Sequence, residues 1–248
     1  MLPIISINQK HPYYPSRLLD LSDAPKEIYC LGNIKALKMP SVAIIGSRKA
    51  SNQGLKYART FSQALANQGF CIVSGLAEGI DAAAHLGALE SNHPIPTIAV
   101  CGTSLDKCYP NKNRALFQQI NQMGLLISEY PVGTATKPFF FPQRNRLIAA
   151  LSLGTLVVEA AIKSGSLITA KCANELGREV FAIPNSISRP SSAGCHHLIK
   201  DGAKLTEKPS DIVDEMRFFL KTCPINSNFL NFFLILHLSV NNKKRKLI

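Results

Sequence analysis

The sequence predicts an α/β fold with a mostly parallel sheet, and three observations lead there. Short, continuous apolar runs of strand length recur along the chain, and each run ends at a glycine or a small polar residue. Stretches with apolar residues at helical spacing separate these runs. Hydrophobic residues make up 46% of the 248 residues and charged residues 18%, which suits a large buried sheet and excludes a disordered chain.

The first predicted strand covers residues 41–45, an uninterrupted apolar run that stops at Gly46. A helix is predicted from about residue 54 to residue 68, because apolar side chains recur at helical spacing there. Gly69 ends that helix, and the apolar run at 70–73 forms the next strand.

The same alternation continues with a helix at 80–89, rich in alanine, and a third strand at 97–101. A helix is predicted near 113–122. A fourth strand at 125–128 follows it, again short and wholly apolar apart from its last residue.

The last elements are predicted in the same way; they are a short helix at 144–151, a strand at 155–158, a helix at 167–176 and a strand at 179–183. Right-handed crossovers between such strands give an extended, Rossmann-like, doubly wound sheet with helices on both faces. We therefore expect a domain over residues 41–215. Residues 1–40 are expected to be an irregular lead-in, rich in Pro and Tyr, and residues 216–248 an atypical tail.

The chain is strongly basic, with 28 Lys and Arg against 16 Asp and Glu and a net charge of +12. The run at 243–246 carries only four of these cations, so the excess extends along the whole chain. A domain of this kind suits a polyanionic partner such as nucleic acid. A soluble basic protein without such a partner is the alternative.

The seven cysteines are odd in number and include no C-x-x-C pair. Several lie within apolar runs, so we expect buried free thiols in a reducing, cytoplasmic compartment and no metal site.

The first 20 residues show no signal peptide. The apolar run at 229–240 is shorter than the roughly 20 residues that span a bilayer. We interpret it as a packed C-terminal segment, with a membrane-surface anchor as the alternative.

Ligand chemistry is expected in the loops after the strands, because ligands of such sheets bind at the carboxyl ends of the strands. The first loop reads Gly46, Ser47, Arg48, which offers close backbone approach, a hydroxyl and a guanidinium for phosphate. It matches neither a dinucleotide fingerprint nor a P-loop.

The next loop, 74–81, contains Gly75 and Gly79; it either binds an anion through backbone N–H groups or simply makes a turn ordered by Asp81. The turn at 102–106, which leads to Tyr109, is a less specific ligand-facing loop.

Three phenylalanines at 139–141 precede Arg144 and Arg146. Aromatic faces stack on unpaired bases and guanidinium groups hold phosphates. The alternative is that the rings fill the core and the arginines form local ion pairs. After the fifth strand, residues 164–166 open a helix beside Lys171 and form an anion pocket.

No catalytic triad, metal cluster or obvious carboxylate pair is visible. His85 is interpreted as a packed histidine. Glu78, Asp81 and Glu159 remain candidate acids with cap or ion-pair explanations.

The motifs resemble those of the DprA/Smf family of bacterial DNA-processing proteins. Six segments carry the resemblance, in order 42–48, 74–85, 141–149, 157–160, 164–170 and 177–184. It extends from about Asp23 to Val213. It implies a non-catalytic Rossmann-like protein without cofactor that binds single-stranded DNA, protects it in natural transformation (competence) and DNA recombination, helps to load the RecA recombinase, and forms homodimers.

The resemblance implies that the first loop lines the DNA pocket, that Arg144 and Arg146 form its basic rim, and that Lys137 contacts phosphate. Together with the loop chemistry above, the candidate DNA-binding residues are Gly46, Ser47, Arg48, Gly75, Lys137, Phe141, Arg144, Asn145, Arg146, Ser164, Gly165, Ser166 and Lys171.

The sequence also departs from the family pattern. Glu78 stands where the pattern usually has Arg, Asn185 where it has Gly, and His196 where it has Asn. The N-terminal helical domain and the C-terminal winged-helix domain common in the family are not expected. Two alternatives stay open: a phosphoribohydrolase of the related LOG type, whose PGGxGTxxE signature is missing here, and a truncated relic that no longer binds DNA. A nicotinamide-dependent oxidoreductase is disfavoured because the glycine fingerprint is missing.

Overall fold

The computed structural model describes residues 3–222, with side chains to residue 217. The chain divides into a compact unit of residues 1–216 and a second unit of residues 217–248. The predicted apolar run at 229–240 and the basic run at 243–246 lie outside the described residues.

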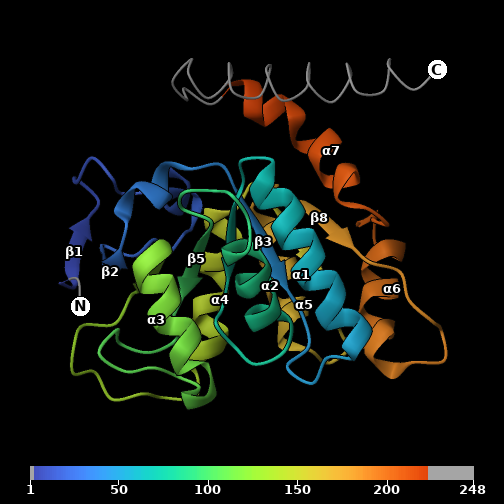
Figure 1. Ribbon diagram of the computed structural model, residues 1–248, viewed down its shortest axis with the longest axis horizontal. Helices are drawn as coiled ribbons and strands as arrows, with labels where there is room; N and C mark the ends of the chain where they lie inside the picture. Colours follow the sequence, from blue (N-terminus) through green and yellow to red (C-terminus); the bar gives the residue numbers. More distant parts are fainter. Residues whose placement is uncertain (1–2, 223–248) are drawn as a thin grey trace. The chain divides into compact units, whose positions relative to one another are not determined.

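Within the described residues, one nine-stranded sheet has the order β1-β2-β6-β5-β4-β3-β7-β8-β9 (Figure 1). The strands are β1 Ile5–Asn8, β2 Glu27–Gly32, β3 Ser41–Ile45, β4 Cys71–Ser74, β5 Thr97–Val100, β6 Leu125–Ser128, β7 Gly154–Val157, β8 Glu179–Ala182 and β9 Lys204–Leu205. The helices are α1 Asn52–Asn67, α2 Ile80–Leu89, α3 Arg114–Met123, α4 Phe140–Leu151, α5 Gly165–Glu175, α6 Ala193–Lys200 and α7 Pro209–Thr222.

The sheet is parallel from β6 across to β9. Helices α1, α2 and α3 cover the near face in Figure 1, and α4 and α5 cover the far face. Strand β3 lies between β4 and β7, so the chain winds outward from β3 in both directions. This arrangement confirms the predicted doubly wound α/β fold and creates a switch point at the carboxyl end of β3.

The burial of the central strands explains why the apolar runs fold this way. All five residues of β3 and all four of β4 are buried. Helix α1 is amphipathic, with Ala58, Phe61 and Leu65 against the sheet. Ser51 caps its start by accepting a hydrogen bond from Gly54 N at 3.1 Å.

Residues 1–40 differ from the expected irregular lead-in. They contain β1, β2 and two short 3-10 helices, η1 (Ser16–Asp20) and η2 (Ile34–Lys38). Strand β2 pairs antiparallel with β6, and Leu18 and Ile28 are fully buried. The strand is hard to see in the sequence because its alternation is broken by the neighbouring buried pair Cys30 and Leu31.

The cysteines agree with the expectation of free thiols. Those in the described residues form no disulfide, and four of them, Cys30, Cys71, Cys101 and Cys195, are buried. Burial raises the pKa of Cys30 and of Cys101 to about 12, so these thiols are not reactive nucleophiles at neutral pH. No helix within residues 3–222 is long and apolar enough to cross a membrane.

Candidate functional site

A cavity of about 510 Å³ opens at the carboxyl end of β3, beside the loops along the lower edge of the sheet in Figure 1. Its walls come from the β3–α1 loop, from Ala77 and Asp81 after β4, from the start of α4 and from the start of α5. The predicted site residues that line it are Gly46, Ser47, Arg48, Phe141, Arg144, Asn145, Ser164, Gly165 and Ser166. The structure therefore brings four separate sequence motifs together around one cavity.

The β3–α1 loop is held tightly at its first residues. A Cβ on Gly46 would lie 2.7 Å from Ile80 Cγ1 and 2.8 Å from Glu159 O, so only glycine fits here. Ser47 N donates to Glu159 O at 2.7 Å. The loop is thus fixed to the end of β7, with Ser47 and Arg48 at the cavity.

Glu159 is a buried carboxylate that fixes the other end of this loop. Its Oε2 accepts from Ser51 N at 2.8 Å, and its Oε1 accepts from Ser191 Oγ at 3.2 Å. A Cβ on Gly54 would lie 2.6 Å from Oε2, so the glycine makes room for the carboxylate. Glu159 has no exposed surface, and its hydrogen bonds explain it as a structural group rather than a catalytic acid.

Arg48 is the cation best placed for a ligand. Its side chain is exposed at the cavity and has no hydrogen-bonded or ionic partner among residues 3–217. Lys49, which the sequence analysis did not single out, also lines the cavity and is exposed. Lys49 could have been predicted as a site residue from the sequence, because it directly follows the Gly-Ser-Arg run. Both charges are free to meet an anion.

Arg144 lines the cavity but is buried, whereas the resemblance implies a place on the basic rim of the DNA pocket. The residue is only 4% exposed. Its Nη1 donates to Gly75 O at 2.6 Å and also to Val100 O. Burial lowers the pKa of Arg144, while the neighbouring Asp81 carboxylate opposes that shift. Burial likewise raises the pKa of Asp81 and Arg144 opposes it, so the two groups support each other's charge.

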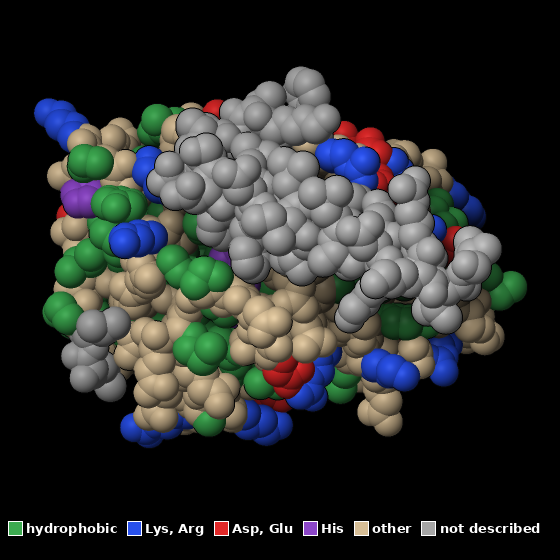
Figure 2. All heavy atoms as spheres, turned by 45° about the horizontal axis from the view of Figure 1, so that its top comes forward, with side chains coloured by type: hydrophobic (Ala, Val, Ile, Leu, Met, Phe, Trp, Pro, Cys, Tyr) green, Lys and Arg blue, Asp and Glu red, His purple; other side chains and the backbone are tan. Residues whose placement is uncertain are grey.

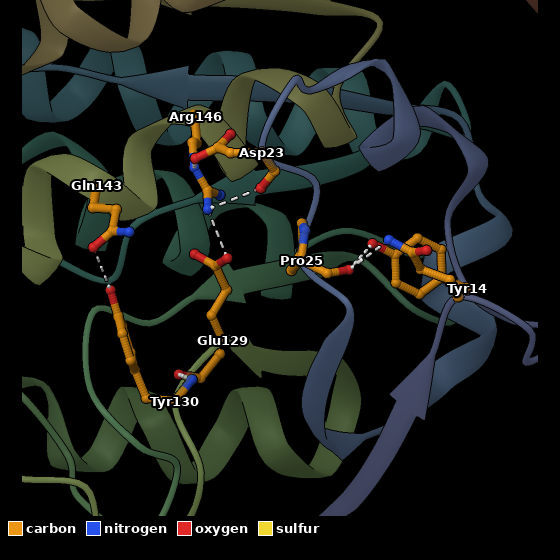
Figure 3. Close-up of polar contacts among 9 residues, drawn as sticks. Tyr14, Asp23, Pro25, Glu129, Tyr130, Gln143 and Arg146 are labelled. Carbon is orange, nitrogen blue, oxygen red and sulfur yellow. Dashed lines mark hydrogen bonds and ion pairs between the residues drawn. The ribbon is translucent and has the colours of Figure 1, made fainter.

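Arg146 is held between two carboxylates, those of Asp23 and Glu129 (Figure 3). Its Nε donates to Asp23 Oδ2 at 2.8 Å and its Nη2 to Glu129 Oε1 at 2.7 Å. Nearby, Tyr14 Oη donates to Pro25 O at 2.5 Å. The Arg146 side chain is 14% exposed and does not line the cavity. These contacts tie α4 to the N-terminal segment and to the end of β6, as the ion-pair alternative proposed.

Three more predicted residues lie outside the cavity lining. Gly75 is behind Arg144, and its missing Cβ leaves room for the guanidinium. Lys137 is exposed with its Nζ 5.8 Å from the ring centroid of Phe139. Lys171 Nζ lies 3.7 Å from Glu175 Oε1 and borders a second cavity of about 540 Å³.

The predicted helix start at residues 164–166 is confirmed. Ser164 is the N-cap of α5 and its hydroxyl accepts from Ser166 N at 3.2 Å. Asn145 Nδ2 donates to Gly165 O at 3.2 Å, which links α4 to this turn. The positive end of the α5 dipole and two serine hydroxyls therefore lie at the cavity.

The aromatic run forms the first turn of α4, which begins at Phe140 rather than at the expected Arg144. Phe140 is buried, and its ring stacks on that of Tyr130 with 3.8 Å between the ring centroids. The Tyr130 hydroxyl donates to Gln143 Oε1 at 3.3 Å. Phe141 instead lines the cavity. One ring of the run thus packs in the core, as the alternative expects, and another lines the cavity.

His85 is confirmed as a packed histidine. It has no exposed surface, and its Nδ1 lies 2.7 Å from Thr97 Oγ1. Burial, with a smaller contribution from Arg144, lowers the pKa of His85 to about 3. Glu78 is half-buried, and its carboxylate pairs with Lys112 Nζ at 3.2 Å. Within the described part of the chain, no cluster of His, Cys, Asp and Glu could hold a metal ion.

Figure 2 shows a face on which the visible Lys and Arg side chains lie at several separate places. The cavity itself is defined by its lining residues, among which Arg48 and Lys49 are the exposed cations.

The proteins that this chain resembles in sequence and in structure belong to one family. The family model of DNA recombination-mediator protein A matches residues 5–217. The DNA processing protein DprA of Streptococcus pneumoniae is 48% identical over 205 residues, covering 83% of this chain and 72% of that protein. Its X-ray structure matches with a TM-score of 0.82 at 47% identity and covers 86% of this chain and 74% of that one.

Protein Smf of Escherichia coli is 44% identical over 213 residues, and the match covers 86% of this chain but only 56% of that protein. DprA of Helicobacter pylori, whose solved structure concerns its single-stranded DNA binding mode, matches at 32% identity with a TM-score of 0.78. That match covers 87% of this chain and 96% of the other.

Proposed function

Because the chain belongs to the DNA recombination-mediator protein A family, we propose that it binds single-stranded DNA at the cavity beside β3, without catalysing a reaction. The observation that carries the proposal is the exposed guanidinium of Arg48, which has no partner among residues 3–217, at a cavity that also presents Ser47 and Ser164. Guanidinium, hydroxyl and backbone N–H groups at a helix start are the groups that bind backbone phosphates. The structure of the Helicobacter pylori relative, which concerns single-stranded DNA binding, supports this choice of ligand.

The site favours single strands over duplex for a physical reason. The bases of a duplex are stacked and paired, so they cannot turn into a cavity whose wall includes the Phe141 ring. Lys49 and the exposed Lys137 are additional phosphate contacts in this proposal. Arg144 and Arg146 serve as scaffold and do not touch the DNA.

The wider biological role is also a proposal. The chain spans 56% of the E. coli relative, so the activity of the longer proteins does not transfer automatically. We propose that the protein protects single strands and aids RecA loading during transformation and recombination in the cytoplasm, as a homodimer. The basis is the family membership.

The enzyme alternative has less support. The loop after β7 lacks the PGGxGTxxE signature of the LOG-type hydrolases, and Glu159, the carboxylate nearest to it in sequence, is buried under hydrogen bonds. Release of free base from a nucleoside monophosphate would revive that alternative.

Fluorescence anisotropy of a labelled oligonucleotide tests the proposal. The wild-type chain should bind the single strand more tightly than the same sequence as duplex. Arg48→Ala should weaken single-strand binding about tenfold, the loss of a charge-assisted contact. Lys35→Ala is the matched control, because Lys35 is equally exposed but lies in η2, before the start of β3. Equal affinity for both DNA forms would contradict the proposal. If the chain binds neither form, the alternative of a truncated relic that no longer binds DNA is favoured.

A further inference from the structure

We propose that the ring of Tyr109 is a second contact point of this site, on which an unpaired nucleobase stacks just outside the cavity. The inference rests on the proposed function, and it adds a base-binding position to what was so far a phosphate-binding cavity.

The first support is the position of the ring. The Tyr109 ring centroid lies 5.0 Å from that of Phe141, with an angle of 41° between the planes. Phe141 lines the cavity, and a Cβ on Gly102 would lie 2.6 Å from its ring, so glycine makes room for that ring. Tyr109 therefore continues the aromatic wall of the cavity outward.

The second support is that the fold does not use the outer part of this ring. Tyr109 is 56% exposed, and its hydroxyl has no hydrogen-bond partner among residues 3–217. Exposed aromatic surface costs free energy in water, and a stacked base would cover it. Phe139 is similarly exposed, at 57%, but it packs edge-on against Phe140 and lies beside Lys137.

The third support is the rigid attachment of the segment. Asn113 Nδ2 donates to Leu76 O at 2.9 Å and to Ala77 O at 3.2 Å. Leu76 has a φ of 58°, a conformation that a leucine rarely adopts, and these hydrogen bonds help to hold it. Since Ala77 lines the cavity, the segment that carries Tyr109 is fixed to the cavity wall and pays little entropy when it binds.

Cationic residues of the same segment favour a nucleotide over an apolar peptide. Arg114, five residues on in the sequence, is exposed and has no ionic partner among the described residues. Lys107, which precedes Tyr109 in the sequence, is also exposed, and its Nζ donates to Thr134 O at 3.0 Å. A segment that carries an exposed aromatic ring and exposed cations offers stacking and phosphate contact together, the combination that single-stranded nucleic acids use.

The test is a coupling experiment between the protein and the DNA. Affinities are measured for wild type, Tyr109→Ala and Tyr109→Phe, with an oligothymidylate and with a series in which one position at a time is abasic. Tyr109→Ala should weaken binding of the intact oligonucleotide about tenfold, and Tyr109→Phe, which keeps the ring, less than about twofold. At one abasic position, the affinity of wild type should fall by the same factor of about ten relative to the intact oligonucleotide. The affinity of Tyr109→Ala should be the same with and without the base at that position.

Phe139→Ala is the control, because it removes an equally exposed ring and should show no coupling to that position. If Arg48→Ala weakens binding but Tyr109→Ala does not, the stacking inference is overturned and the proposed function stands. If Tyr109→Ala loses affinity equally at every abasic position, the ring supports the fold instead, which also overturns the inference. If wild type binds no oligonucleotide, the proposed function itself fails.

Discussion

Two neighbouring groups of cations differ sharply in this molecule. On the β3–α1 loop, Arg48 and Lys49 are exposed at the cavity and Arg48 has no partner among the described residues. On α4, Arg144 is 4% exposed and Arg146 is held between two carboxylates. Both groups come from motifs typical of phosphate binding, yet only the first is exposed. Burial and pairing, not residue type, separate a binding arginine from a supporting one.

The comparison predicts opposite phenotypes for the two groups, and Arg144→Ala should have the largest effect. It leaves the buried Asp81 without its cation and removes the donor to Gly75 O and Val100 O. Removing one partner of a buried pair costs about 3–5 kcal/mol, and we expect a loss of that order in urea unfolding. A loss below about 1 kcal/mol would show that Arg144 is not part of the scaffold.

Arg146→Ala should cost less, about 2 kcal/mol, because Asp23 on one side of the pair is itself exposed. The mutation leaves the largely buried carboxylate of Glu129 without its cation. Urea unfolding measures the loss. Lys35→Ala, which removes an exposed charge of the same sign, should leave unfolding unchanged and serves as its control. Equal, small losses in both variants would remove Arg146 from the scaffold.

The buried side of the comparison also predicts a pH dependence at His85. Its pKa is lowered to about 3 in the folded chain, against about 6.5 when unfolded. Between these values the unfolded chain binds a proton that the folded chain excludes, so the free energy of unfolding falls as the pH falls.

From pH 7 to pH 5 this group should remove about 2 kcal/mol. His93, whose pKa is also lowered by burial, acts in the same direction, whereas the raised pKa of Asp81 acts against it. The variant His85→Asn cannot titrate, so the difference between its pH profile and that of wild type isolates His85. Parallel profiles would contradict the prediction.

The smallest effect is expected at Ser164, which belongs to both groups because it caps α5 and lines the cavity. Ser164→Ala should lower thermal stability by about 1 kcal/mol through the lost cap. Ser164→Asp keeps the cap but adds a negative charge, so it should preserve stability and weaken DNA binding severalfold. If the aspartate variant binds DNA like wild type, Ser164 is not near the phosphates.

Much of the fold could be predicted because the sequences of buried parallel strands are short, continuous apolar runs. The strands from β3 to β8 and the helix start at Ser164 are confirmed on that basis. Strand β2 was missed, because a half-regular pattern in a Pro-rich segment looks like a loop.

The roles of the α4 arginines could not be read from the sequence. Asp23, which holds Arg146, lies 123 positions away along the chain. Only the packing of η1 and β2 against α4 and β6 brings such groups together. Arg144 is an exception to the rule that arginines are rarely fully buried, so its motif was interpreted as part of a basic rim.

The salt dependence of single-strand affinity tests the central claim most directly. For wild type, Arg48→Ala and Arg146→Ala, the affinity is measured across a range of salt concentrations. The account predicts that Arg48→Ala reduces the slope of log affinity against log salt by about 0.7, the value for one phosphate contact on a single strand. Arg146→Ala should keep the wild-type slope. A reduced slope in Arg146→Ala with an unchanged slope in Arg48→Ala would contradict the account.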